Sequence, residues 1–561
     1  MSATDFGAQK HSKLRPLWIT LKIVLTLFLI SAALVLAGGG YVLHRTGIGG
    51  AMWALAREQG LVWTAYVDPL TAKEMRQKAL AGFADQLDAH SQYMPPVEER
   101  EFMEQINGSF GGVGVAFGAR KGQAVALIVY PDSPAAKAGI KTGDVLLSAE
   151  NHPIDAKNLI EELRNVRGPV GTTVHLTMAR QGKELAPFAV KREQIDTPSV
   201  ASTVIPADKS PTGKPVALIQ LREFTNRTPE ELGATLEKLF AGDTPPTSLI
   251  IDERRNPGGV LSSSVATAAF FLPTSATVVS SLGRGAADPR GDDANTQFWK
   301  AQAADYWSGP ADMDPVQKTH GAVKGLVDSI PIAVLIDSSS ASAAEIFAGA
   351  LKDNNRAVIV GQNSFGKGSV QQIFPLGEDG AIKFTVSRYY TPSGKSIQAL
   401  GVAPDIKAGD DDAALRESDL PRHLPAPKID VHGRPVVAAR STDPNADAMA
   451  QAELLMKVRN ARASQLANLL EAKDATKKAI PGAKSDDDLP APQDPFAVDS
   501  QAKPSDPFVK AAMEALAAGK GKPGPLAPPP AGVADKGKAA SATSEASKAA
   551  AVEMSLVDPK F

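Results

Sequence analysis

The sequence predicts an α/β (α+β) fold with a smaller β-rich domain inserted near its front, a helical N-terminal segment, one membrane-spanning helix and a disordered C-terminal tail. Across residues 213–408, short apolar runs alternate with segments of helical periodicity, which indicates strands and helices in succession. Across residues 108–192, glycine-rich turns separate short apolar runs, which is typical of a compact β-rich domain. Residues 17–43 form one long apolar stretch, and residues 484–561 are rich in Pro, Ala, Lys and Asp.

Composition limits the functions that the chain can carry out. A formal net charge of −2 over 561 residues argues against nucleic acid as a partner. The absence of cysteine excludes disulfide bonds, thiol nucleophiles and cysteine-based metal sites. The eight histidines are scattered without the spacing of metal ligands, so we expect no cofactor and no metal.

The N-terminal apolar stretch predicts a membrane anchor over residues 17–43. At about 1.5 Å of rise per residue, a helix of this length crosses the roughly 30 Å of a bilayer core. The positive-inside rule places residues 1–16, which hold three basic side chains, in the cytoplasm and the rest of the chain on the periplasmic side of the inner membrane. A cleaved signal peptide is the less favoured alternative, because the stretch is long and LAGGG lacks an A-x-A cleavage site.

Residues 51–105 are expected to form a helical N-terminal segment with polar turns. One of these turns carries His90, within LDAHSQYMPP at residues 87–96. A Ser-His catalytic pair is one role that such a histidine could have. We favour a structural role for His90, as the cap of a turn.

Residues 108–192 resemble a PDZ domain. The resemblance depends on the turn GGVGV at Gly111–Val115, a predicted strand at Ala124–Tyr130, and the segment SPAAKAGIKTGDVLLSAENHPI at Ser133–Ile154. PDZ domains bind the C-terminal residues of a peptide as an added strand, and the N–H groups of the glycine turn hold the terminal carboxylate. The alternative is an ordinary β-rich domain with glycine turns. The peptide-binding residues that the resemblance implies are Gly112, Val113, Gly114 and Val115.

The candidate reactive residues lie in one strand–turn–helix segment. A buried strand is predicted at Ile332–Ile336, followed by a serine-rich turn and a helix at Ala343–Asn354. Ser342 therefore lies where a strand gives way to a helix, close to free backbone N–H groups. After a strand at Ala357–Val360, a glycine-rich turn presents Lys367.

This arrangement predicts a serine that is made nucleophilic by a lysine. A serine hydroxyl is a weak nucleophile unless a nearby base removes its proton, and lysine serves as that base only when it is neutral. Burial favours the neutral amine, because desolvation penalises the ammonium form. Gln371, four residues after Lys367, is expected to orient the amine without a charge that would keep it protonated.

Four motifs resemble those of the carboxy-terminal processing peptidases, also called tail-specific proteases. They are SASAAE at Ser340–Glu345, FGKGSVQ at Phe365–Gln371, RYYTPSGKSIQ at Arg388–Gln398 and GVAPDI at Gly401–Ile406. The resemblance implies a serine endopeptidase with Ser342 as nucleophile, Lys367 as base and Gln371 completing the site. It implies protein substrates with exposed or unfolded C-termini, captured by the PDZ domain, and leaves an activating adaptor open. It gives His90 no catalytic role.

The turn NPGG at Asn256–Gly259 resembles the loop that supplies the oxyanion hole of this family. The donors implied are the backbone N–H groups of Gly258 or Gly259 and of Ala343, which point at charge that develops only in the transition state. Arg167 matches a family arginine that senses substrate and reports to the active site. The chain departs from the family pattern at Ala89, where the family has proline, and at Glu253, Arg255, Ser339 and Ala344, which supply no catalytic atom.

Two regions lie outside these motifs. Residues 283–325 are polar and long for a loop, which predicts an insertion that forms a lid or an exposed hairpin. Residues 445–475 have helical periodicity, whereas residues 484–561 lack an apolar run that could form a core, so we expect a helix followed by disorder. A solvated extension is favoured over a partner-binding tail.

Three other functions fit parts of the sequence. GQNSFGKGS at Gly361–Ser369 nearly matches the phosphate loop of nucleotide hydrolases, but Gly368 occupies the Ser/Thr position that binds magnesium, and a strand is predicted to follow. A membrane-tethered PDZ scaffold on an inactive protease fold requires loss of the serine or the lysine, and both are present. The arrangement of penicillin-binding proteins places lysine three residues after serine, where this chain has Glu345.

Overall fold

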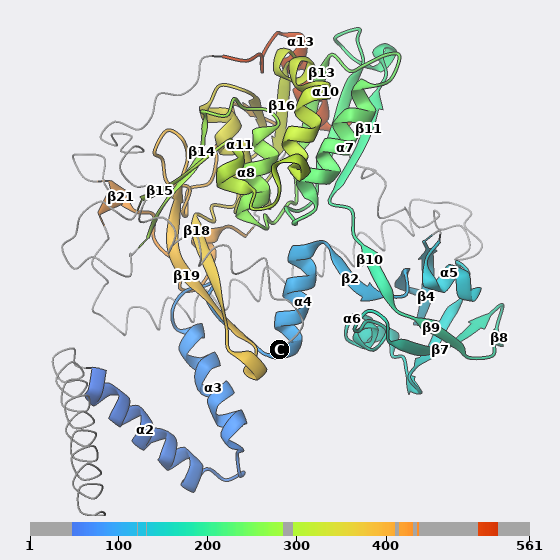
Figure 1. Cartoon of the computed structure of the whole chain (residues 1–561), viewed down its shortest axis with the longest axis vertical. Coiled ribbons are helices and arrows are strands. Elements are labelled where there is room, and N and C mark those ends of the chain that lie inside the picture. Colours follow the sequence, from blue (N-terminus) through green and yellow to red (C-terminus); the bar gives the residue numbers. More distant parts are fainter. Residues whose placement is uncertain are drawn as a thin grey trace, which may run out of the picture. The chain divides into compact units, whose positions relative to one another are not determined.

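The computed structural model describes residues 48–120, 122–130, 132–283, 296–409, 415–429, 435–436 and 503–524. The chain divides into two compact units, residues 1–82 and residues 83–561 (Figure 1). The predicted anchor at residues 17–43 and the predicted helix at residues 445–475 lie outside the described residues. Within the described ranges, no helix has both the length and the apolar character that crossing a bilayer requires.

Helices form the N-terminal segment, as the periodicity predicts. They are α2 (Ile48–Ala65), α3 (Ala72–Asp85) and α4 (Pro96–Asn107), and the short strand β1 (Gln92–Met94) lies between the last two. Helix α4 ends at Gly108, whose φ of 65° is left-handed and therefore suits glycine. The chain then enters the β-rich domain.

A seven-stranded sheet forms the β-rich domain, with the strand order β3-β4-β5-β7-β8 and with β6 and β9 paired to β5 and β7. The strands are β3 (Val115–Arg120), β4 (Gln123–Val129), β5 (Val145–Ala149), β6 (His152–Pro153), β7 (Thr173–Arg180), β8 (Lys183–Glu184) and β9 (Phe188–Lys191). Its core buries Leu146, Leu176 and Met178 beneath α5 (Pro134–Ala138) and α6 (Leu159–Glu162). Strand β3 ends the sheet, so its outer edge pairs with no other described strand.

A six-stranded sheet forms the centre of the larger domain, in the order β11-β12-β13-β16-β17-β20. Its strands are β11 (Val200–Ile205), β12 (Val216–Leu221), β13 (Ser248–Asp252), β16 (Ile332–Ile336), β17 (Val358–Gly361) and β20 (Ile406–Lys407). All neighbours are parallel except β11 and β12. Every residue of β12, β13 and β16 is buried, as expected for parallel strands that are covered on both faces.

Helices cover both faces of this sheet (Figure 1). Four helices pack on one face, namely α7 (Thr228–Phe240), α8 (Leu261–Ala269), α10 (Pro315–Ser329) and α11 (Ala343–Asp353). The opposite face packs on one helix, α13 (Pro507–Ala517). Alternate residues of β12 enter the two cores, Ile219 with the four helices and Leu218 with α13. The sheet is therefore the middle of three layers.

Helix α13 corrects the prediction of a disordered tail over residues 484–561. Its Val509, Ala512, Met513 and Leu516 are buried, and they recur at helical spacing, so one apolar stripe faces the sheet. Asp506 caps the helix by accepting hydrogen bonds from two N–H groups of the first turn. The disorder prediction is wrong for residues 503–524, and the rest of the predicted tail lies outside the described residues.

The region predicted to be a lid or exposed hairpin contains the second strand of a hairpin and a helix that packs one face on the core. Strand β14 (Thr277–Gly283) pairs with β15 (Thr296–Lys300) as a hairpin whose connection lies outside the described residues. Helix α10 follows, and its Val316 and Val327 are each 1% exposed. The segment has a polar composition because α10 buries only one stripe of valines.

Candidate active site

Ser342 caps the first turn of α11, directly after the turn that follows β16. Its φ of 55° and ψ of −114° form a rare conformation that costs a non-glycine residue about 1–3 kcal/mol. Its N–H donates to the Glu345 carboxylate at 2.8 Å, and the N–H of Ala341 donates to the Asn256 carbonyl at 3.0 Å. These contacts hold the strained turn in place.

Lys367 lies on the glycine-rich loop between β17 and β18 (Ser369–Pro375) and is half-buried. Desolvation first, and the charge of Lys383 second, lower the pKa of its amine from the ordinary 10.5 to about 8. Glu417, Glu345 and Asp88 oppose this shift. A substantial fraction of the amine is therefore neutral in mildly alkaline solution.

Glu345 links the serine to the lysine loop. Its carboxylate accepts hydrogen bonds from the N–H groups of Ser342 at 2.8 Å, Gly366 at 2.7 Å and Lys367 at 2.8 Å, and from the Ser364 hydroxyl. The side chain is buried, and desolvation raises its pKa to about 7 against the effect of these hydrogen bonds. One carboxylate thus fixes the start of α11 and the backbone beside the amine.

The role of Glu345 went unnoticed in the sequence, although a signal was present. Ser342 and Glu345 stand three residues apart at the start of a predicted helix, which is the spacing of a capping box. In that motif the glutamate accepts the N–H of the capping residue, as it does here at 2.8 Å. Its further bonds to the lysine loop could not be anticipated from local spacing.

Gln371 lies on β18, in a network that does not include the Lys367 amine. Its amide donates to the Ser369 hydroxyl at 2.9 Å and to the Thr385 hydroxyl at 3.1 Å, and Thr385 donates to Asp88 at 3.1 Å. No hydrogen bond joins the Ser342 hydroxyl to the Lys367 amine in the described structure. The orienting role of Gln371 stays a prediction.

The NPGG turn lies directly beside the serine. Gly258 has a φ of 103°, and a Cβ there would lie 2.7 Å from Ser342 Cβ and 2.9 Å from the Ala343 nitrogen. The Gly258 N–H donates to the Asn256 side chain at 2.9 Å. By contrast, the N–H groups of Gly259 and Ala343 make no hydrogen bond among the described residues. Of the predicted donors, these two are free to bind an oxyanion.

The glycine turn of the β-rich domain joins β2 (Ser109–Gly112) to the edge strand β3. Gly112 pairs with Glu193 of β10 (Glu193–Asp196). The N–H groups of Val113 and Gly114 have no acceptor in the described structure, and Val115 begins the free edge. These free donors and the unpaired edge are the features that a peptide C-terminus requires.

Arg167 lies against Phe110, the residue directly before this turn, and the N–H of the next residue, Gly168, donates to the Gly111 carbonyl at 3.1 Å. The Arg167 guanidinium carbon lies 4.4 Å from the centre of the Phe110 ring, and the Arg167 N–H donates to the Leu163 carbonyl at 3.2 Å. The side chain is exposed. The substrate-sensing role that the resemblance implies for Arg167 stays a prediction.

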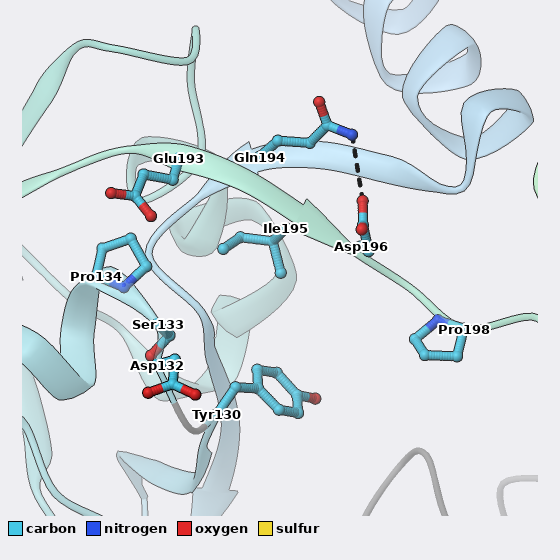
Figure 2. A pocket seen from close by; sticks show the side chains of 9 residues that line it. All are labelled: Tyr130, Asp132, Ser133, Pro134, Glu193, Gln194, Ile195, Asp196 and Pro198. Atoms are coloured by element: carbon cyan, nitrogen blue, oxygen red, sulfur yellow. Dashed lines mark hydrogen bonds between the residues drawn. The ribbon is translucent and has the colours of Figure 1, made fainter.

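A pocket of about 370 Å³ opens beside the glycine turn (Figure 2). Ser133 and Ile195 line it, and a Cβ on Gly114 would lie 2.4 Å from Ser133 Cβ. Asp132 and Glu193 also line it. Carboxylates repel a peptide carboxylate, so this pocket does not suit the terminal group that the turn would hold.

Comparisons with known proteins identify two domains and a family. Residues 215–408 match peptidase family S41, and residues 111–188 match the PDZ domain. The carboxy-terminal-processing protease of Bartonella bacilliformis is 32% identical over 398 residues, which cover 69% of this chain and 83% of that protein. The chain belongs to the carboxy-terminal-processing protease family. The protease CtpB of Bacillus subtilis is 29% identical over 397 residues, covering 70% of this chain and 74% of that protein.

The solved structure of the photosystem II D1 C-terminal processing protease aligns with 63% of this chain and with 86% of its own chain. The sequence identity is 21% and the TM-score is 0.35. The two family matches show that this protease is a serine peptidase with a PDZ domain ahead of its peptidase domain. The phosphate-loop alternative is wrong, because the strand β18 follows the glycine-rich loop where a nucleotide hydrolase has a helix.

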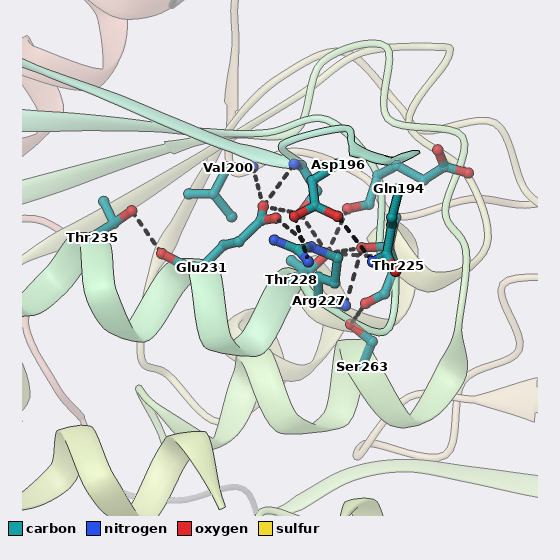
Figure 3. Close-up of polar contacts among 11 residues, drawn as sticks. Gln194, Asp196, Val200, Thr225, Arg227, Thr228, Glu231, Thr235 and Ser263 are labelled. Atoms are coloured by element: carbon teal, nitrogen blue, oxygen red, sulfur yellow. Dashed lines mark hydrogen bonds and ion pairs between the residues drawn. The ribbon is translucent and has the colours of Figure 1, made fainter. Parts of the chain in front are cut away.

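Polar contacts join the strand that leaves the PDZ domain to the peptidase domain of this protease (Figure 3). Arg227, at the start of α7, pairs with Asp196 of β10 at 3.0 Å. Ser263 of α8 donates to the Thr225 carbonyl at 2.6 Å. The end of β10 is therefore fixed to the helices that cover the catalytic sheet.

Glu253 is a buried acid of the protease without a partner. It is 0% exposed, and neither carboxyl oxygen makes a hydrogen bond in the described structure. Burial raises its pKa well above the ordinary range, and the charge of Asp252 adds to this effect. The resemblance places leucine here, and leucine fills a similar volume without a polar group.

We expect Glu253→Leu to raise the free energy of unfolding by about 1–3 kcal/mol. Because folding raises the pKa of Glu253, the wild-type protein becomes less stable as pH rises and the buried acid ionises. The stability difference between the leucine variant and the wild type should therefore grow with pH. Urea unfolding at one acidic and one alkaline pH measures both effects. Glu253→Gln, which keeps an unpaired polar group, is the control and should gain less. A leucine variant that is less stable than the wild type at both values would contradict this account.

Proposed function

We propose that this protease cleaves peptide bonds through an acyl-enzyme on Ser342, with Lys367 as the general base. The observation that supports this most strongly is the Glu345 carboxylate, which accepts the N–H groups of both residues. It holds the backbones of the nucleophile and the base close to each other. The desolvated amine, with a pKa of about 8, is a base of suitable strength.

In this mechanism the neutral Lys367 amine removes the proton from the Ser342 hydroxyl as its oxygen attacks the substrate carbonyl. The N–H groups of Gly259 and Ala343 stabilise the resulting oxyanion. The Lys367 ammonium then returns the proton to the leaving amine, and the C–N bond breaks. Water attacks the acyl-enzyme with Lys367 again as base, which releases the acid product and restores the hydroxyl.

The Ser342 hydroxyl and the Lys367 amine must approach each other for the first step. In the structure they share no hydrogen bond, although the same carboxylate holds their backbones. Hydrogen bonds of catalytic groups are often long before substrate binds. We propose that substrate binding brings the Ser342 hydroxyl and the Lys367 amine within hydrogen-bonding distance, and that Gln371 orients the amine.

The PDZ domain is proposed to capture the exposed or unfolded C-terminus of a protein substrate. The peptide would add to the free edge of β3, and the N–H groups of Val113 and Gly114 would hold its carboxylate. Partly buried Phe117 and Leu163 flank the domain core and offer apolar contacts to the last side chains.

We also propose that residues 17–43 anchor the protease in the inner membrane, with its peptidase domain on the periplasmic side. The apolar stretch and the basic residues before it support this orientation. The test adds an external protease to spheroplasts. If the peptidase domain is digested only after lysis, the proposed orientation is wrong.

One experiment tests capture by the turn. We expect Gly114→Asp to slow cleavage of an unfolded protein with a free C-terminus by roughly tenfold or more, and to spare a short peptide. The added Cβ would lie 2.4 Å from Ser133 Cβ, and the new charge would repel the carboxylate. Gly122→Asp is the matched control, because Gly122 has a similar φ of 74° and open space around its Cβ position. Mass mapping of the fragments gives both rates. Equal losses on the two substrates would count against capture.

A further inference from the structure

A segment that follows the matched peptidase region folds back on the lysine loop. Its residue Glu417 is 0% exposed, although it lies beyond residue 408, where the match to the peptidase family ends. Its backbone N–H donates to the Phe365 carbonyl at 3.1 Å, two residues before Lys367. A buried carboxylate at this place requires partners, because an isolated buried charge is strongly unfavourable.

Two side chains supply those partners. The Gln398 amide donates to the Glu417 carboxylate at 2.8 Å, and His90 Nε2 lies 2.7 Å from its other oxygen. Gln398 is itself fully buried, and its Oε1 accepts the N–H of Gly368 at 2.9 Å. A chain of hydrogen bonds therefore runs from Glu417 through Gln398 to the residue that follows Lys367.

The backbone around the amine is thereby held from two sides. Glu345 accepts the N–H groups of Gly366 and Lys367, whereas Gln398 accepts the N–H of Gly368. Three successive N–H groups are bound by two buried acids, one directly and one through a glutamine. Such support fixes the direction of the lysine side chain that emerges between them.

We propose that Glu417 is a positioning residue for the catalytic lysine, acting through Gln398, which it holds against the backbone beside the amine. Its charge also favours the ammonium form of that lysine. This inference rests on the proposed role of Lys367 as base. His90 contacts the carboxylate oxygen of Glu417 that does not bind Gln398. The His90 side chain therefore contacts Glu417, whereas the Asp88 side chain accepts the His90 N–H and caps the turn in place of the histidine that the sequence predicts.

The charged groups around Lys367 set the sign of the effect. Lys383 lowers the pKa of the amine, whereas Glu417, Glu345 and Asp88 raise it. Removing the charge of Glu417 while keeping its shape should lower that pKa and leave the loop in place. Removing the side chain should release the loop, because Gln398 then loses an acceptor.

The test compares three variants of the full-length chain by the pH dependence of kcat/KM on an unfolded protein substrate. Glu417→Gln should move the acid limb of the profile to lower pH and keep most of the kcat on the plateau. Glu417→Ala should lose roughly tenfold or more in kcat with little change in KM. Asp419→Asn is the matched control, since Asp419 lies exposed in the same turn, and it should behave as the wild type.

Thermal unfolding confirms that each variant is folded. An unmoved acid limb in Glu417→Gln would overturn the inference, even if Glu417→Ala proved unstable. An equal shift in Asp419→Asn would also overturn it, because the effect would then come from net charge. Absence of cleavage by the wild-type chain would instead refute the proposed function, and the inference with it.

Discussion

Replacing Ser342 or Lys367 with alanine is expected to abolish proteolysis, with losses of roughly 10⁴-fold or more in kcat. The serine variant has no oxygen to form the acyl-enzyme. The lysine variant keeps the hydroxyl but loses the base whose backbone is held by the same Glu345 carboxylate as the serine. The two losses should be similar in size and should not add in the double variant, because the two groups act as a unit.

The measurement is the rate at which each purified variant degrades an unfolded protein with a free C-terminus. Matched controls are Ser339→Ala and Lys407→Ala, which alter exposed residues of the same types in the same domain. Both controls should retain activity, and all variants should unfold at temperatures close to that of the wild type. Cleavage by Lys367→Ala at a rate near that of the wild type would refute the lysine mechanism.

Replacing Met513 with aspartate is expected to destabilise the peptidase domain by about 3 kcal/mol or more. Met513 is 2% exposed and lies on α13, against the face of the sheet that the other helices leave open. A charge there either remains buried or forces the helix off the sheet. Loss of the helix also removes Asp506, one of two acidic partners of Arg254, which binds it at 3.0 Å and lies two residues before the NPGG turn.

Urea unfolding followed by circular dichroism gives the size of this effect. Glu514→Asp is the matched control, because Glu514 is the exposed neighbour on the same helix, and it should change stability little. An unchanged stability in Met513→Asp would show that α13 contributes nothing to the domain. It would restore the original expectation of a tail without a structural role.

The sequence was sufficient to predict the strand–turn–helix around Ser342 and the loop that carries Lys367. Both depend on short-range patterns, namely a five-residue apolar run and helical spacing after it. The strained φ of Ser342 and the free N–H of Gly259 are properties of the folded backbone. No residue pattern specifies which N–H of the NPGG turn remains free.

Helix α13 was not predicted because its apolar stripe stabilises the helix only when it packs on the sheet. Eleven residues form a marginal helix by themselves, and their surroundings in the chain are rich in Pro, Ala and Lys. The contact of His90 with Glu417 was missed because 327 residues separate the two. Long-range pairs of this kind follow from the fold and not from any local motif.

The most direct test of the central claim is the pH dependence of kcat/KM for the wild-type chain on an unfolded protein with a free C-terminus. If neutral Lys367 is the base, activity should rise with pH through an acid limb near the amine's pKa of about 8 and then level off. Activity that is already constant across this range, with a limb near roughly pH 6.5 as for histidine, would contradict the account.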